Sequence, residues 1–232
     1  MYQRKYQAEV PKVLNLILFG ASGMVGQGVL RECLLDPEVR KVLSLVRRPT
    51  GRQHAKLREL VHRDLLDFST IETELTGFEA CFFRLGVSSV GMTEEAYTRV
   101  TYDLTMAAAR TLVKLNPAMT FIYVSGQGTD SSERGRIMWA RVKGMTENAV
   151  LRLPFKAAYM FRPGIIQPLH GIRSGSKVYQ AFYKVMGPFV PLLKKLLPKH
   201  VTTTESVGRA MIKIAKQGGP KRILDNQNIN GL

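Results

Sequence analysis

Apolar runs separated by segments of helical periodicity occupy most of the first 165 residues. The first run, VLNLILFG at residues 13–20, is nearly free of polar positions, as expected of a strand that is buried on both faces of a sheet. Similar runs predict five further strands, at residues 41–48, 59–65, 79–86, 119–126 and 157–164.

Helical segments lie between these runs. MVGQGVLRECLL repeats its apolar residues at helical spacing and is followed by Asp36-Pro37, which ends a helix. Thr93 and Ser69 are expected to cap two further helices. The predicted helices occupy residues 24–35, 69–77, 93–115 and 133–153, and a last one begins near Thr204. This alternation predicts an α/β fold with a doubly wound parallel sheet.

The sequence FGASGMVGQG joins the first strand to the first helix and holds three glycines in a G-x-x-G-x-x-G pattern. Glycine permits a tight turn, a close approach of the backbone to a pyrophosphate and close helix–strand packing, and the helix N-terminus attracts phosphate. A merely tight turn is the weaker interpretation, because the pattern opens a βαβ unit. The expected loop contacts to the cofactor are Gly20, Ser22, Gly23, Met24, Val25 and Gly26. We therefore expect a Rossmann domain at residues 1–165.

The end of the second strand carries Arg47 and Arg48, 21 and 22 residues beyond Gly26. A protein that prefers NAD would have an acidic residue there for the ribose 2′-hydroxyl. Arginine instead pairs with a 2′-phosphate through two parallel hydrogen bonds, and the Ser22 hydroxyl can add a third. We predict NADP as the cofactor, although one of the two arginines could be a solvated surface charge.

Five motifs of this sequence resemble those of the short-chain dehydrogenase/reductase superfamily. They are the loop GASGMVG, the arginines after the second strand, the SG pair that ends the fifth strand, a W-x-x-x-K motif and FRPG. The likeness is to its atypical branch, the NmrA-like and epimerase-like NAD(P)-binding Rossmann proteins. It covers roughly residues 13–165. It implies an oxidoreductase or a sugar-nucleotide epimerase with a small-molecule substrate that the sequence does not identify.

In that family a serine, a tyrosine and a lysine four residues after the tyrosine perform the reaction. The resemblance assigns Ser125 to the serine and Lys143 to the lysine, which also holds the nicotinamide ribose. Trp139 stands in the tyrosine position. An indole N–H does not titrate in the working range and cannot act as a general acid or base. Trp139 is then a wall of the pocket that stacks on the nicotinamide, or only part of the core. Tyr97, Tyr102 and Tyr123 are replacement donors by residue type alone.

The resemblance implies further cofactor contacts at three strand ends. Asp64 and Leu65 match the family's adenine contact, although Asp64 could be a surface charge. The strand-four contacts are Leu85, Gly86 and Val87, and those beside the nicotinamide are Pro163, Gly164 and Ile165.

Composition narrows the function classes. The chain has 34 Lys and Arg against 18 Asp and Glu, a net charge of +16, which attracts polyanions without choosing among them. No nucleic-acid-binding motif is present, so we do not expect nucleic acid as a partner. Two distant cysteines indicate reduced, buried thiols, and four scattered histidines predict no metal site. No apolar run is long enough for a signal peptide or a membrane span, so we expect a cytoplasmic protein. We also expect it to be a monomer or a homodimer.

Residues 166–232 are expected to form a C-terminal lid or substrate region packed on the same domain. Its leucines and lysines at 192–199 form a basic amphipathic segment, which fits a lid, a peripheral membrane contact or a subunit contact. Three functions therefore stay open: an NADP(H)-dependent enzyme with an altered proton donor, a non-catalytic NADPH-sensing regulator, and a basic Rossmann protein associated with a membrane surface or nucleic acid.

Overall fold

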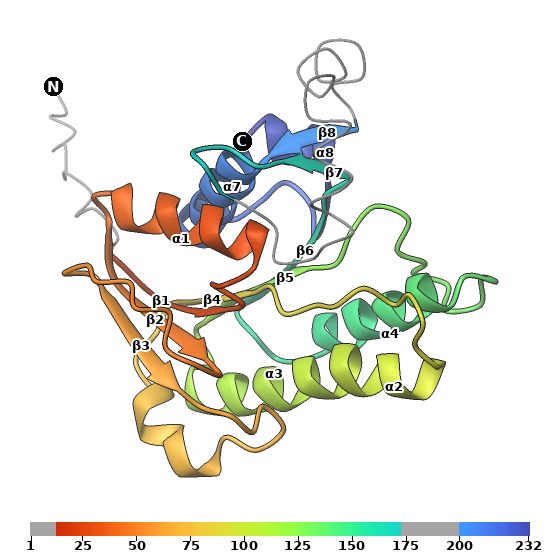
Figure 1. Cartoon of the computed structure of the whole chain (residues 1–232), viewed down its shortest axis with the longest axis horizontal. Helices are drawn as coiled ribbons and strands as arrows, with labels where there is room; N and C mark the ends of the chain where they lie inside the picture. Colours follow the sequence, from red (N-terminus) through yellow and green to blue (C-terminus); the bar gives the residue numbers. More distant parts are fainter. Residues whose placement is uncertain (1–12, 173–199) are drawn as a thin grey trace, which may run out of the picture.

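The computed structural model describes residues 13–172 and 200–232 (Figure 1). Seven parallel strands form one sheet in the order β3-β2-β1-β4-β5-β6-β9. The strands are β1 (Leu14–Phe19), β2 (Val39–Val46), β3 (Leu57–Val61), β4 (Ala80–Phe83), β5 (Thr120–Val124), β6 (Ala157–Arg162) and β9 (Ile223–Asp225). This arrangement confirms the predicted doubly wound Rossmann fold.

The order of the strands reverses at β1. Ile17 of this strand pairs with Leu43 of β2 on one side and with Cys81 of β4 on the other. The connections from β1 and β4 leave toward opposite faces of the sheet, so a crevice opens at the carboxyl ends of these two strands. The fold thereby places the candidate site between the loops that follow β1, β4, β5 and β6.

Helices cover both faces of the sheet (Figure 1). One face carries α1 (Met24–Leu35), α7 (Thr204–Gln217) and α8 (Asn226–Asn230), and the other carries η1 (Ser69–Leu75), α2 (Glu94–Thr98), η2 (Arg99–Asp103), α3 (Leu104–Leu115) and α4 (Met138–Leu151). Each layer has its own apolar core: Val29 and Met211 lie in the first, and Phe83 and Leu112 lie in the second.

Two predicted N-caps have different outcomes. The Thr93 hydroxyl accepts a hydrogen bond from the Ala96 amide at 3.2 Å and caps α2, as predicted. The prediction for Ser69 is wrong. Phe68 holds the cap position of η1 without a side-chain bond, and the Asp67 carboxylate accepts the Ser69 amide at 2.9 Å. The helix predicted at 93–115 is continuous, with one turn of π-helix at η2 between α2 and α3.

The last part of the chain joins the Rossmann body. β9 pairs with β6, and α7 buries its apolar side chains in the same core as α1. β7 (Ile165–Gln167) and β8 (Val201–Thr203) form a small parallel sheet. The basic amphipathic segment at 192–199 lies outside the described residues, so its role and that of 166–232 as a lid stay predictions. In the described part of the chain, no helix is long and apolar enough to span a bilayer.

Candidate functional site

The glycine loop between β1 and α1 is packed so tightly that side chains do not fit. Gly20 has φ +82°, and a Cβ atom there would overlap the Arg84 carbonyl oxygen. A Cβ atom at Gly26 would overlap the Gly20 carbonyl oxygen. Gly23 holds the cap position of α1, whose first turn contains no acidic residue. The N-terminus of this helix could therefore hold an anion such as a diphosphate.

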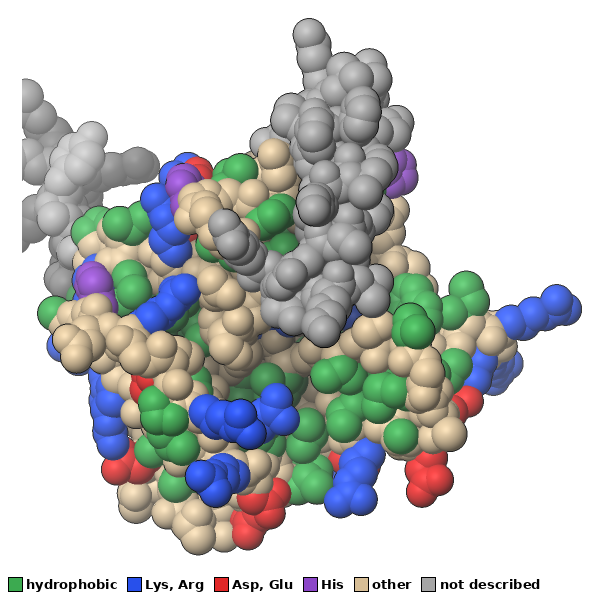
Figure 2. Space-filling view, in the orientation of Figure 1, with side chains coloured by type: hydrophobic (Ala, Val, Ile, Leu, Met, Phe, Trp, Pro, Cys, Tyr) green, Lys and Arg blue, Asp and Glu red, His purple; other side chains and the backbone are tan. Residues whose placement is uncertain are grey.

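An arginine groove lies beside this loop. It is lined by Ser22, residues 46–50 and Arg63. Arg47 and Arg48 follow the last residue of β2, and Arg63 comes two residues after β3, so adjacent parallel strands bring the three side chains to one edge of the sheet. In Figure 2, Lys and Arg side chains gather near the end of β2. The sequence pattern does not single out Arg63, because this residue follows the third strand and reaches the groove only through the pairing of β3 with β2.

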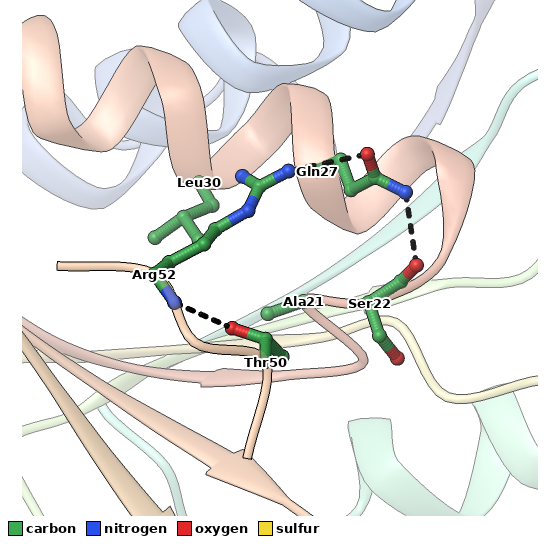
Figure 3. Close-up of a pocket in the computed structure, with 6 residues that line it drawn as sticks. All are labelled: Ala21, Ser22, Gln27, Leu30, Thr50 and Arg52. Atoms are coloured by element: carbon green, nitrogen blue, oxygen red, sulfur yellow. Dashed lines mark hydrogen bonds between the residues drawn. The ribbon is translucent and has the colours of Figure 1, made fainter. Parts of the chain in front are cut away.

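A second, smaller pocket adjoins the groove (Figure 3). Arg52 Nη2 donates to Gln27 Oε1 at 3.2 Å, and Gln27 Nε2 donates to the Ser22 carbonyl oxygen at 3.0 Å. The Thr50 amide donates to Glu59 Oε2 at 2.9 Å. The first two bonds connect the loop after β2 to α1 and to the glycine loop, and the third connects it to β3, so that the edge of the arginine groove is held from both sides.

Lys143 and Trp139 lie one turn apart on α4, at the carboxyl end of β5. Lys143 Nζ donates to the Ser125 carbonyl oxygen and lies 5.9 Å from the centroid of the indole ring. The indole packs over Gly128, where a Cβ atom would lie 3.2 Å from Trp139 Cη2. Burial and, to a smaller extent, the Arg84 guanidinium together lower the pKa of the Lys143 amine to about 8, against an opposing contribution from the Glu147 carboxylate.

The Ser125 hydroxyl is held by a buried ion pair. Its Oγ lies 2.5 Å from Glu147 Oε1 and 3.2 Å from the Phe161 carbonyl oxygen. Glu147 is fully buried and accepts two bonds from Arg162 Nε, at 3.0 and 3.1 Å. The sequence contained a signal for this pair, since Glu147 is one helical turn after Lys143 and Arg162 belongs to the FRPG motif.

The predicted nicotinamide contacts follow β6. The Gly164 amide donates to Asn226 Oδ1 and the Ile165 amide donates to the His200 carbonyl oxygen, both at 3.0 Å. The Pro163 carbonyl oxygen accepts the Gln127 amide at 2.8 Å. The Pro163 carbonyl oxygen thus contacts the segment after β5, whereas the two amides bond to residues of the C-terminal part of the chain, and each of the three groups already has a partner.

The predicted adenine contacts lie apart from Lys143. Asp64 is exposed and accepts the Leu66 amide at 2.9 Å, whereas the Leu65 side chain is buried in the core. Leu85, Gly86 and Val87 follow β4, and the Leu85 amide adjoins Gly20. Cofactor contacts at all five residues stay predictions.

The candidate replacement tyrosines differ in exposure. Tyr97 and Tyr123 are only 2% and 1% exposed, and burial raises the pKa of Tyr123 above its usual range. A hydroxyl with so little access to solvent cannot exchange protons readily with a substrate in the crevice. Tyr102 is half-buried and packs against the core beside α3.

The prediction of no metal site stays a prediction. In the described part of the chain, Glu32, His170 and Glu205 have ligand atoms within 4.8 Å of one another. Arg209 contacts both carboxylates, at 3.2 and 2.8 Å, and Arg31 contacts Glu32 at 2.5 Å. Two guanidinium groups therefore balance the two carboxylates and leave no net negative charge to attract a cation.

Several known proteins are similar to this chain in sequence. Protein FMP52, mitochondrial, from Saccharomyces cerevisiae is 29% identical over 167 residues, 71% of this chain and 69% of that protein. Protein HTATIP2 from Rattus norvegicus is 26% identical over 155 residues, 66% of this chain and 62% of that protein. The matches span about two thirds of the length of these relatives. No family model matches the chain.

Solved structures share the fold. An oxidoreductase of the short-chain dehydrogenase/reductase family from Burkholderia thailandensis has a TM-score of 0.65 at 16% identity, covering 88% of this chain and 86% of that one. The Bordetella bronchiseptica enzyme WbmF in complex with NAD+ and UDP has a TM-score of 0.67 at 15% identity, covering 94% of this chain and 73% of that one.

The relatives overturn one expectation from the sequence. Several of them carry names that place them in mitochondria, which contradicts the cytoplasmic location expected here. That expectation relied on the absence of an apolar targeting run, and amphipathic, basic targeting segments need no such run.

The strand order and the glycine loop give this chain the same Rossmann fold as these solved structures. In sequence the chain is similar to the FMP52 and HTATIP2 proteins.

Proposed function

We propose that this protein binds NADP(H) and is an oxidoreductase- or epimerase-like member of the short-chain dehydrogenase/reductase superfamily with an altered proton donor. The observation that carries the cofactor preference is the groove in which Arg47, Arg48 and Arg63 meet Ser22 beside the glycine loop. The residues that line it include no Asp or Glu. A ribose 2′-phosphate fits this set of donors, whereas a 2′-hydroxyl calls for a carboxylate.

The rest of the crevice fits a dinucleotide. Gly23 caps α1 without a side chain and the first turn of the helix has no acidic residue, which supports binding of a diphosphate against the backbone there. Ser125, Lys143 and Trp139 lie where the nicotinamide half would end. Bound NADPH would supply two electrons to a carbonyl substrate.

The proton for such a reaction needs another source than tyrosine. Trp139 does not titrate, and the Ser125 hydroxyl is engaged by Glu147. Lys143 is the group next to Ser125 whose ammonium form can release a proton near neutral pH, because its pKa is lowered to about 8. We therefore assign proton donation to Lys143 Nζ, at a rate below that of a tyrosine-containing enzyme.

Trp139, in the position where the resemblance implies a tyrosine, also favours a second candidate function. A protein that keeps the cofactor groove and replaces the proton donor with tryptophan could serve as a sensor of NADPH. Sustained turnover of a carbonyl substrate would exclude this role. Binding of NADPH without turnover of any substrate would support it.

Calorimetric titration with NADPH and NADH tests the cofactor assignment. We expect NADPH to bind at least about 10-fold more tightly, and Arg48→Gln to remove most of this preference. Arg58→Gln is the matched control, because Arg58 is exposed and paired with Glu74 outside the groove. Equal affinities for the two nucleotides in the wild-type protein would refute the assignment.

A further inference from the structure

Arg84 lies against the glycine loop, although no motif of the sequence points to it. It follows β4 directly, and its amide donates to the Phe19 carbonyl oxygen at 3.2 Å. Its side chain reaches α1: Nη1 lies 3.1 Å from the position that a Cβ atom at Gly23 would take. Gly23 is the cap residue of α1. The guanidinium therefore sits at the helix N-terminus, where the diphosphate is expected.

The position of Arg84 favours binding of an anion between its guanidinium group and the N-terminus of α1. The N-terminus of a helix carries a partial positive charge, and the first turn of α1 has no acidic residue to offset it. A guanidinium at that end adds a full positive charge at the same place. A diphosphate bound there would receive hydrogen bonds from both the backbone amides and Arg84.

Arg84 also acts on Lys143. Burial is the main reason why the pKa of Lys143 is lowered to about 8, and the guanidinium of Arg84 is the second. The Glu147 carboxylate opposes both and raises this pKa, while Glu147 itself is paired with Arg162. Two further contacts of the Lys143 amine within the described residues, with the Ser125 carbonyl oxygen and the Trp139 ring, are to groups that do not titrate.

We propose that Arg84 is a ligand of the cofactor's diphosphate and that it couples cofactor binding to protonation of Lys143. This inference rests on the proposed function. The two negative charges of a diphosphate offset the guanidinium, so its repulsion of the Lys143 ammonium falls and the amine binds its proton more tightly. The protein then takes up protons when NADPH binds near pH 8, and its affinity for NADPH decreases as the pH rises through this range.

Calorimetry of the full-length protein measures this coupling directly. NADPH is titrated at pH 8 in Tris and in HEPES, whose ionisation enthalpies differ, and phosphate buffer is avoided because it would compete for the arginines. We expect an uptake of up to about half a proton per site, because a group with a pKa near the working pH is half protonated beforehand. Arg84→Gln should weaken NADPH binding about 10-fold or more and remove the uptake.

Two further variants test which residues cause the proton uptake. Arg48→Gln should weaken binding of NADPH but keep the proton uptake, because Arg48 belongs to the 2′-phosphate groove. Lys143→Arg keeps its charge at pH 8 and should bind NADPH without uptake. Thermal denaturation of each variant shows whether it is folded. If Arg84→Gln is unstable, Lys143→Arg still shows whether Lys143 is the group that takes up the proton.

The outcomes separate this inference from the proposed function. Tight NADPH binding with no proton uptake, or with uptake unchanged in Arg84→Gln or Lys143→Arg, would overturn the role of Arg84 and leave the cofactor assignment standing. A wild-type protein that binds no NADPH would overturn both.

Discussion

Lys143 Nζ lies 5.9 Å from the centroid of the Trp139 indole ring, on the same face of α4. At this separation a cation is attracted to the face of an aromatic ring. The resemblance in sequence to the short-chain dehydrogenase/reductase superfamily implies a tyrosine at the position of Trp139. Here the indole instead contacts the lysine whose amine donates to the Ser125 carbonyl oxygen.

Trp139→Tyr should restore the missing proton donor. A positioned general acid typically contributes ~10²–10⁴ in rate, so we expect NADPH-dependent reduction of an accepted carbonyl substrate to rise about 100-fold. The measurement is NADPH consumption with a panel of aldehydes and ketones. Trp139→Phe, which removes the indole without adding a hydroxyl, should give no rise, and an equal gain in both variants would argue against the assignment.

The pKa of Lys143 should be visible by NMR of the lysine side-chain nitrogens. We expect one lysine to titrate at about 8 in the protein without cofactor, because burial and Arg84 disfavour its charged form. The signal should vanish in Lys143→Arg, which identifies it. A set of lysines that all titrate near 10.5 would contradict the description of this site.

Glu147→Gln should destabilise the fold. It leaves the Arg162 guanidinium without its buried partner, and the loss of one member of such a pair lowers the free energy of unfolding by about 3 kcal/mol. Urea denaturation measures this change. Glu72→Gln is the control, since Glu72 is partly exposed and lies 3.9 Å from the exposed Lys114, and it should cost less than about 0.5 kcal/mol. Similar values for the two variants would show that the buried pair contributes little.

Gly26→Ala should abolish NADPH binding, because the new methyl group would overlap the Gly20 carbonyl oxygen and displace the loop. Such overpacking should also lower the free energy of unfolding by about 2 kcal/mol. Gly86→Ala serves as the stability control, since no atom lies within 4 Å of its Cβ position. An unchanged affinity for NADPH in Gly26→Ala would mean that the dinucleotide binds elsewhere.

The fold could be predicted from the sequence because its strands are long apolar runs and its helices have clear periodicity. α1 has the bounds expected from MVGQGVLRECLL. The three-residue strands β7, β8 and β9 could not be predicted, since segments this short are stabilised by pairing with strands that are distant in sequence.

The candidate site, too, could be predicted only in part. The glycine loop and the Trp139–Lys143 spacing are local motifs that can be recognised in the sequence. Arg63 and Arg84 reach the site from other strand ends, and no local pattern distinguishes them from surface charges. Glu147 is one helical turn after Lys143, but its bond to Ser125 depends on tertiary packing. The partners of the Gly164 and Ile165 amides come from the last 33 residues and depend on tertiary packing.

The central claim is that NADPH occupies the crevice between the glycine loop, the arginine groove and α4. Trp139 is the only tryptophan in the chain, so its fluorescence reports on this place alone. When NADPH and NADH are titrated in parallel, we expect both nucleotides to quench the emission. The midpoint of the NADPH titration should lie at a concentration about 10-fold or more below the midpoint for NADH. Emission that stays unchanged at saturating NADPH, or equal midpoints for the two nucleotides, would contradict the claim.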